Sequence, residues 1–220
     1  MAVNKRFKLK KKFDESTYNQ KVAGSNKLGK GEHVVTLTSV EEVDSDKWHA
    51  YDLIWQDSEG RTAKERSFIT FEDRETGERD ISDKFHRLGL ALAGGNNKLG
   101  YEFFADTDSG AYCDVERMSL AVGCKAIINI GLPRKGVAIK NVDSEMFAYD
   151  IETNEIIDEV GGHADIKDLI DAIKEIGLPL KFNQVLSHKV SREDSAANIE
   201  LLQKALNTSD KQEKTNVVDF

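Results

Sequence analysis

Residues 32–43, EHVVTLTSVEEV, begin the part of the sequence that decides the fold. This segment is rich in Val, Thr and Leu, and the first two favour β-strands. Two further strand-like segments follow, 47–57 (KWHAYDLIWQD) and 61–71 (RTAKERSFITF), and the sequence DSEG at 57–60 predicts the turn between them. The chain therefore begins its folded part with three consecutive strands.

A helix and two more strands are expected after these three. The helix is predicted at 82–93, and the strands at 122–132 and 136–142 are joined by the turn Pro133-Arg134-Lys135. Three strands, a helix and two strands is the order of an OB-fold, a partly open five-stranded barrel that binds oligonucleotides and oligosaccharides. The expected fold class is mainly β with some α: a five-stranded OB-fold-like Greek-key barrel with appended C-terminal helices.

The appended helices are predicted from amphipathic stripes. In residues 163–176, Ile166, Leu169 and Ile173 recur at spacings of three and four, and 192–206 repeats this pattern. Such stripes indicate core packing or a dimer interface more often than a ligand surface, so a homodimer is possible on this pattern.

Composition divides the chain into four expected parts. Residues 1–28 form a basic irregular leader, 29–151 the OB-fold-like barrel, 152–207 a helical extension and 208–220 a flexible C-terminal tail. Within the barrel, 94–114 is expected to be a long glycine-rich connection, the kind of loop that often has a function.

Charge is distributed unevenly. The 220 residues carry a net charge of −8, yet residues 1–12 contain six Lys or Arg and no acid. A basic arm on an acidic body is typical of an interaction segment, so Lys10, Lys11 and Lys12 are expected to contact nucleic acid. The alternative is a solubilising disordered tail.

A cytoplasmic location is expected. The basic residues of 1–12 precede no apolar segment of a secretory signal, and no apolar run approaches the ~20 residues of a membrane helix. Cys113 and Cys124 are the only cysteines, which predicts reduced thiols rather than a disulfide framework.

Cations and aromatic residues alternate on the second and third strands. Single-stranded nucleic acid requires this pattern, because bases stack on rings while Lys and Arg contact phosphates. His49, Tyr51, Leu53 and Trp55 share one face of the second strand, opposite Trp48. The candidate nucleic-acid-binding residues on these strands are Trp48, Tyr51, Lys64, Arg66 and Phe68.

The alternative for these aromatics is a place in the barrel core, because large rings are mostly buried. Trp55 and Phe71 are assigned to the core, although periodicity does not say which face is inside. Arg134 and Lys135, at the tip of the predicted last hairpin, complete the candidate interface, since the loop between strands four and five flanks an OB-fold groove.

No motif predicts catalysis, so the chain is expected not to be an enzyme and to need no cofactor or metal. The sequence from Asp106 to Gly110 begins like a calcium loop, but Arg117 stands where the twelfth-position Glu is required. His86 and the two cysteines match no zinc spacing.

Five segments together resemble a known family. They are FD at 13–14, LGKGEH at 28–33, YDLIW at 51–55, DSEGR at 57–61 and FHRLGL at 85–90. Their order and spacing resemble the OB-fold single-stranded DNA-binding proteins of bacterial viruses. The resemblance implies a protein that coats single-stranded DNA in replication and recombination.

The last residues add to this resemblance. Many proteins of that family finish in an acidic segment with a terminal Phe that docks onto polymerase or helicase, and this chain finishes in Asp219-Phe220. The resemblance therefore implies recruitment of replication proteins through these two residues.

Other functions stay open on the sequence. The main alternative is a protein-interaction or assembly factor that uses the barrel and the C-terminal helices without binding nucleic acid. A third possibility is an enzyme subunit such as a nuclease or a polymerase accessory.

Overall fold

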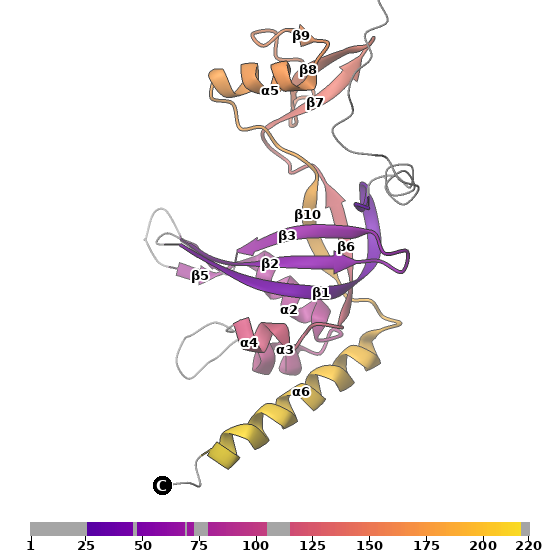
Figure 1. Cartoon of the computed structure of the whole chain (residues 1–220), viewed down its shortest axis with the longest axis vertical. Coiled ribbons are helices and arrows are strands. Elements are labelled where there is room, and N and C mark those ends of the chain that lie inside the picture. The colour runs from indigo at the N-terminus through magenta and orange to yellow at the C-terminus, as the bar shows by residue number, and fades with distance from the viewer. Residues whose placement is uncertain (1–25, 46–47, 69, 73–78, 105–114, 217–220) are drawn as a thin grey trace, which may run out of the picture.

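The computed structural model describes residues 26–45, 48–68, 70–72, 79–104 and 115–216. They form a mixed α/β structure built on a five-stranded antiparallel sheet, with helices below the sheet and a smaller unit above it (Figure 1). In spatial order the five strands are β10 (Gln184–Lys189), β6 (Lys125–Gly131), β1 (Gly31–Ser45), β2 (Trp48–Gln56) and β3 (Thr62–Phe68).

The central strand β1 is long enough to pair with two strands. Its first part, from Gly31 to Thr36, pairs with β6, and its second part, from Thr36 to Ser45, pairs with β2. The β1–β2 register shifts between Leu37 and Ser39, which is a β-bulge. A bulge bends a strand and increases its twist, so β1 can curve from one neighbour to the other (Figure 1).

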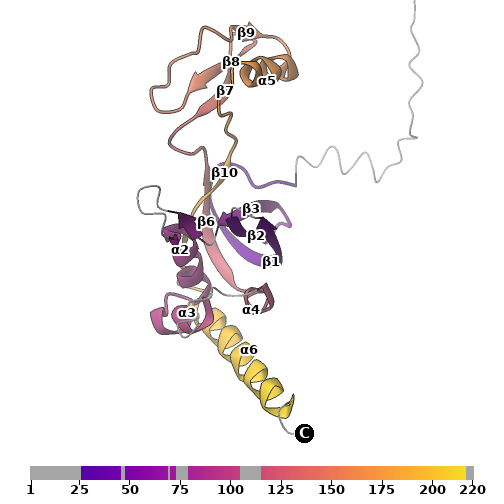
Figure 2. The ribbon, with the colours of Figure 1, turned by 90° about the vertical axis from the view of Figure 1, so that its left-hand side faces the viewer.

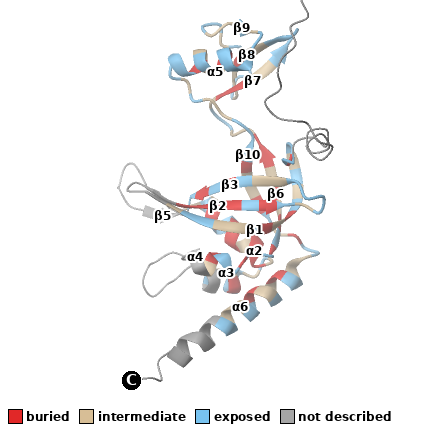
Figure 3. Ribbon diagram, in the orientation of Figure 1, coloured by how far each residue is buried: buried red, intermediate tan, exposed pale blue. Residues whose placement is uncertain are grey.

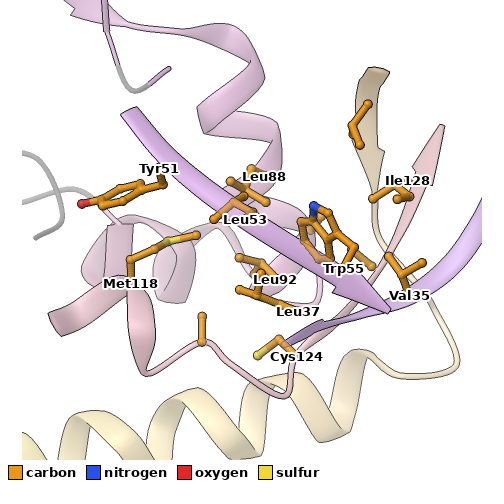
Figure 4. Close-up of a cluster of buried hydrophobic side chains, with 14 of the residues drawn as sticks. Val35, Leu37, Tyr51, Leu53, Trp55, Leu88, Leu92, Met118, Cys124 and Ile128 are labelled. Atoms are coloured by element: carbon orange, nitrogen blue, oxygen red, sulfur yellow. The ribbon is translucent and has the colours of Figure 1, made fainter. Parts of the chain in front are cut away.

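One face of the sheet packs on helices and makes the main core. Tyr51, Leu53 and Trp55 of β2 point from the sheet toward α2 (Asp83–Leu92), whose Leu88 and Leu92 are fully buried (Figure 4). Ser82 caps α2, because its hydroxyl accepts a hydrogen bond from the Phe85 amide at 3.1 Å. The same cluster includes Val35, Leu37, Met118, Cys124, Ala126 and Ile128.

Three more helices complete this part of the molecule. They are α3 (Asn97–Phe104), α4 (Val115–Ser119) and α6 (Ser195–Asn216). Asn198 fastens α6 to β6, since its side chain accepts from the Lys125 amide at 2.9 Å and donates to the Lys125 carbonyl at 2.7 Å. Beyond this anchor α6 extends away from the sheet (Figure 1).

The smaller unit is inserted between β6 and β10. It consists of β7 (Val137–Val142), β8 (Glu145–Asp150), β9 (Gly162–His163) and α5 (Ile166–Glu175), with the strands in the order β7-β8-β9. It has a hydrophobic cluster of its own around Val137, Ala148, Leu169 and Ile173. Two chain segments connect it to the sheet (Figure 2).

A short two-stranded hairpin, β4 (Thr70–Glu72) with β5 (Arg79–Ile81), lies in the sequence between β3 and α2.

Buried residues concentrate in the sheet and in α2, whereas α5 and the described part of α6 expose most of their surface (Figure 3).

Most predicted elements are confirmed, but the predicted fifth strand of the barrel is wrong. Residues 136–142 do not form a hairpin with 122–132; they pair with β8 in the smaller unit. Asp143 and Ser144 take φ angles of +49° and +74°, which makes the tight turn that favours β7–β8 pairing. The fifth strand of the main sheet is β10, which arrives only after the inserted unit.

The expected barrel is not closed. Among the described strands, β3 and β10 are the two edges of the sheet, and no backbone ladder joins them. Side chains bridge this opening instead, because His188 of β10 hydrogen-bonds to Glu65 of β3 at 2.8 Å.

Three boundaries also differ from those predicted from the sequence. The expected division at residue 151 falls inside the smaller unit, whose core joins residues on both sides of it. The expected connection 94–114 contains α3, and α6 continues to Asn216 rather than ending near 206. The last two differences have one cause, because loop-like or polar composition hides short helical segments, whereas the division at 151 fails because the core of the smaller unit joins residues far apart in the sequence.

Candidate nucleic-acid interface

The outer face of β3 presents two cations and an aromatic ring to solvent. Lys64, Arg66 and Phe68 alternate with the buried Glu65 and Ser67, as the two-residue period of a strand requires. The side chains of Lys64 and Arg66 are 64% and 44% exposed, and Phe68 is 44% exposed. Three of the predicted binding residues therefore share one accessible face.

Both cations of this face share one carboxylate, Asp52 of β2. Arg66 binds it in a bidentate manner, with Nε and Nη2 at 2.7 and 2.9 Å, and the Lys64 ammonium lies 2.8 Å away. The Arg66 hydrogen bonds, helped by Lys64, outweigh the effect of burial and lower the pKa of Asp52 from 3.8 to about 2. The positive charge of the face is thus partly neutralised.

Replacement of Asp52 by asparagine is expected to lower the free energy of unfolding at neutral pH. In acid the free energies of unfolding of the two proteins should converge. The lowered pKa means that ionised Asp52 stabilises the folded state above about pH 4, and that this contribution disappears as the pH falls toward 2. Urea unfolding of wild type and Asp52→Asn at several pH values measures the difference. Other carboxylates titrate in both proteins, and their contributions cancel when the two free energies of unfolding are subtracted. A difference in the free energy of unfolding that stays constant down to pH 2 would contradict the ion-pair assignment.

The prediction that Tyr51 is exposed is wrong. Tyr51 is fully buried, and its ring centroid lies 6.1 Å from that of Phe85 on α2. Trp55 is also fully buried, as assigned from the sequence. The two residues are four positions apart and so share a strand face; only one face of β2 carries a run of large apolar residues, and that face is the core.

Arg134 and Lys135 are exposed, but they do not lie on a barrel hairpin. They occupy the connection between β6 and β7, where the chain leaves the sheet for the smaller unit. The Lys135 ammonium is 4.0 Å from a Glu152 carboxylate oxygen, an exposed pair of little energetic consequence.

The remaining predicted site residues lie outside the described part of the chain. These are Lys10, Lys11 and Lys12 of the basic arm and Asp219 and Phe220 at the other end. The backbone of Trp48 belongs to β2, but the side chains of Trp48 and Phe71 are also outside the described residues.

A buried polar network that sequence reasoning missed joins the two edges of the sheet. Glu65 Oε2 accepts hydrogen bonds from Trp55 Nε1 at 2.9 Å and from His188 Nε2 at 2.8 Å. The Lys84 ammonium of α2 lies 2.7 Å from Glu65 Oε1 and also donates to the Val185 carbonyl of β10. One carboxylate therefore ties together β2, β3, β10 and α2.

The network favours the ionised form of Glu65. Burial alone would raise the pKa of Glu65, but the His188 hydrogen bond and the charges of His188 and Lys84 lower it below its usual value. Ionised Glu65 can only accept, so His188 must carry a proton on Nε2. His188 Nδ1 is buried without a partner among the described residues.

The described ranges contain one free thiol and no cluster of potential metal ligands. Cys124 is a buried free thiol, and burial raises its pKa to about 12, so it is a poor nucleophile. Among the described residues no group of three or more His, Cys, Asp or Glu side chains is placed to hold a metal ion. None of the described helices combines the length and apolar character needed to cross a membrane.

Comparison of the chain with protein-family models, with curated proteins and with solved structures found no significant match in any of the three.

Proposed function

We propose that the chain binds single-stranded nucleic acid across the outer face of β2 and β3, as a non-enzymatic strand-coating protein. The observation that carries the proposal is the row Lys64, Arg66 and Phe68 on one accessible face of β3. Cations that contact phosphates beside a ring that stacks on a base are the two parts of sequence-independent strand binding. Ile54, 37% exposed and paired with Lys64 on the neighbouring strand, adds apolar surface to this face.

We also propose that the main sheet and α2 form an OB-fold. It is supported by the order of three consecutive strands, a helix that packs beneath them, a strand that returns to β1 and a last strand beside it. The Glu65–His188 contact between β3 and β10 supports this assignment, because an OB-fold barrel would close between these two strands. The smaller unit then occupies the loop between the last two barrel strands.

The sequence resemblance, rather than the geometry of the face, favours single-stranded DNA of a replicating bacterial virus as the ligand. Recruitment of replication proteins through Asp219 and Phe220 stays a prediction from that resemblance.

Replacing Lys64 with alanine is expected to weaken single-strand binding and to reduce its salt dependence. Each phosphate neutralised contributes about −0.7 to the slope of log affinity against log salt, so the slope should become shallower by about 0.7. The fold should persist, because Arg66 still holds Asp52 through two hydrogen bonds. Fluorescence anisotropy with labelled oligothymidylate over a NaCl series gives the slope.

Lys174→Ala is the matched control for this experiment. Lys174 lies on α5, is 68% exposed and is also paired with an aspartate, Asp171, at 3.2 Å. Equal slopes for wild type and Lys64→Ala, with both proteins binding the strand, would place the phosphate contacts elsewhere on the chain.

A protein-interaction factor is the second candidate. The observation in its favour is exposed apolar surface on and beside the smaller unit, where Ile166, Ile176 and Phe182 are 50%, 47% and 62% exposed. Surface of this kind is typical of protein contacts when it is contiguous. Absence of strand binding by the wild-type chain would favour this candidate.

A further inference from the structure

A cleft of about 400 Å³ lies where the smaller unit meets the sheet. Its walls come from the start of β1, the end of β6, the start of β10 and the segment around β8. The volume falls within the range of small-molecule sites in proteins. The cleft is formed by the inserted unit together with the sheet, so neither part makes it alone.

Three polar side chains that line the cleft have no partner among the described residues. Within the described part of the chain, Lys30 has no ion-pair partner, and the side-chain amides of Asn129 and Asn154 make no hydrogen bond. Among the residues that line the cleft, one ammonium and two side-chain amides are therefore available to a ligand. An ammonium suits a phosphate, and an amide can both donate to and accept from the edge of a nucleobase.

An aromatic ring in the cleft is held in place by its neighbours. The Lys140 ammonium lies 4.9 Å from the centre of the Tyr149 ring and also donates to the Asn154 carbonyl at 3.3 Å. This cation–π contact fixes the ring relative to the turn that carries Asn154. Ile151 and Leu186 supply apolar wall on the two sides of the cleft. A planar, partly apolar ligand fits such a lining.

We propose that this cleft binds one nucleotide of the single strand, an inference that rests on the proposed function. The base lies against Tyr149 with its polar edge toward Asn129 and Asn154, and Lys30 receives a phosphate. The cross-strand register leads from Lys64 through Ile54 to Ser39 of β1, and Gly31 at the cleft is eight residues away, about 26 Å at ~3.3 Å per residue along the strand. A strand bound on the outer face of β3 would therefore have to cross β2 and run along β1 toward its first residue to reach the cleft.

Three single variants of the full chain test the inference with labelled oligothymidylate. Tyr149→Leu should reduce the affinity by about 5- to 150-fold, the range for loss of one base–aromatic stack. Tyr149→Phe should retain the affinity, because the ring remains. Lys30→Ala should make the salt slope shallower by about 0.7. Tyr101→Leu and Lys204→Ala are matched controls, since both side chains are exposed on helices below the sheet.

Thymidine monophosphate, titrated into the isotope-labelled protein and followed by NMR, tests the cleft without the strand. Shifts at Gly31, Gly131 and Asn154 are expected, and Tyr149→Leu should abolish them. If wild type binds oligothymidylate but the cleft variants bind equally well and no shifts appear, the inference is wrong and the proposed function stands. If wild type binds neither probe, both are wrong.

Discussion

Replacing Glu65 with glutamine is expected to lower the free energy of unfolding by about 3–5 kcal/mol, the typical cost of breaking a buried ion pair from one side. Glu65 is 3% exposed and receives contacts from Trp55, His188 and Lys84. Glutamine keeps the shape but presents an amide N–H₂ to either His188 or Lys84, both of which are donors. The partly buried Lys84 charge also loses its counterion. Urea unfolding followed by circular dichroism measures the loss.

Glu59→Gln is the control for this variant. Glu59 is paired with Arg61 at 3.3 Å, but its side chain is 68% exposed, and an exposed pair contributes about 0–1 kcal/mol. If Glu65→Gln is no less stable than Glu59→Gln, the network does not hold the two edges of the sheet together, and the proposed barrel closure loses its physical basis.

Tyr51→Ala and Trp55→Ala are each expected to lower the free energy of unfolding by about 3–5 kcal/mol, because each removes a large side chain from a filled core. Both residues are fully buried between β2 and α2 (Figure 4). Trp55→Ala also removes the donor that Glu65 accepts. Circular dichroism during urea unfolding reports the change without relying on tryptophan emission.

Phe68→Ala provides the contrast, since Phe68 lies on the outer face of β3 and is 44% exposed. Its stability should change much less, while its affinity for a single strand should fall by about 1–3 kcal/mol if the ring stacks on a base. A variant of Tyr51 that folds with native stability and binds the strand poorly would mean that β2 presents its other face to the core.

The local strand pattern predicted much of the sheet. The segments around Val35, Leu53 and Ile128 are rich in β-branched and apolar residues, and each became a strand of the sheet. The two-residue alternation in β3 also places Lys64 and Arg66 on the face opposite Glu65. Lysine and arginine are mostly exposed in proteins, so these two residues could be identified as surface residues from the sequence alone.

Contacts distant in sequence could not be predicted in this way. His188 is 123 positions from Glu65, and nothing local marks it as the partner that bridges β3 and β10. A glutamate at an inward-facing position of β3 was the available signal, since a buried carboxylate requires a partner. Residues 136–142 are expected beside 122–132 on strand propensity, which identifies a strand but not its neighbour. The tight turn at Asp143 and Ser144, where both φ angles are positive, pairs β7 with β8 instead.

The errors at the site have one physical origin. A side chain can be assigned to a face from the two-residue period, but the choice of inner face depends on what packs against it. Tyr51 was expected in the groove although it shares its face with Trp55, and α2 covers that face. The cleft beside Tyr149 depends on a unit whose place above the sheet no sequence pattern indicated.

The most direct test of the central claim is the affinity of the full chain for oligothymidylate and for a duplex of the same length, measured by fluorescence anisotropy over a NaCl series. We expect binding to the single strand, with log affinity falling by about 0.7 per neutralised phosphate for each unit of log salt. Binding to the duplex should be much weaker, because stacking on Phe68 requires unpaired bases. Equal affinity for the two ligands, or no binding to the single strand at low salt, would contradict the account.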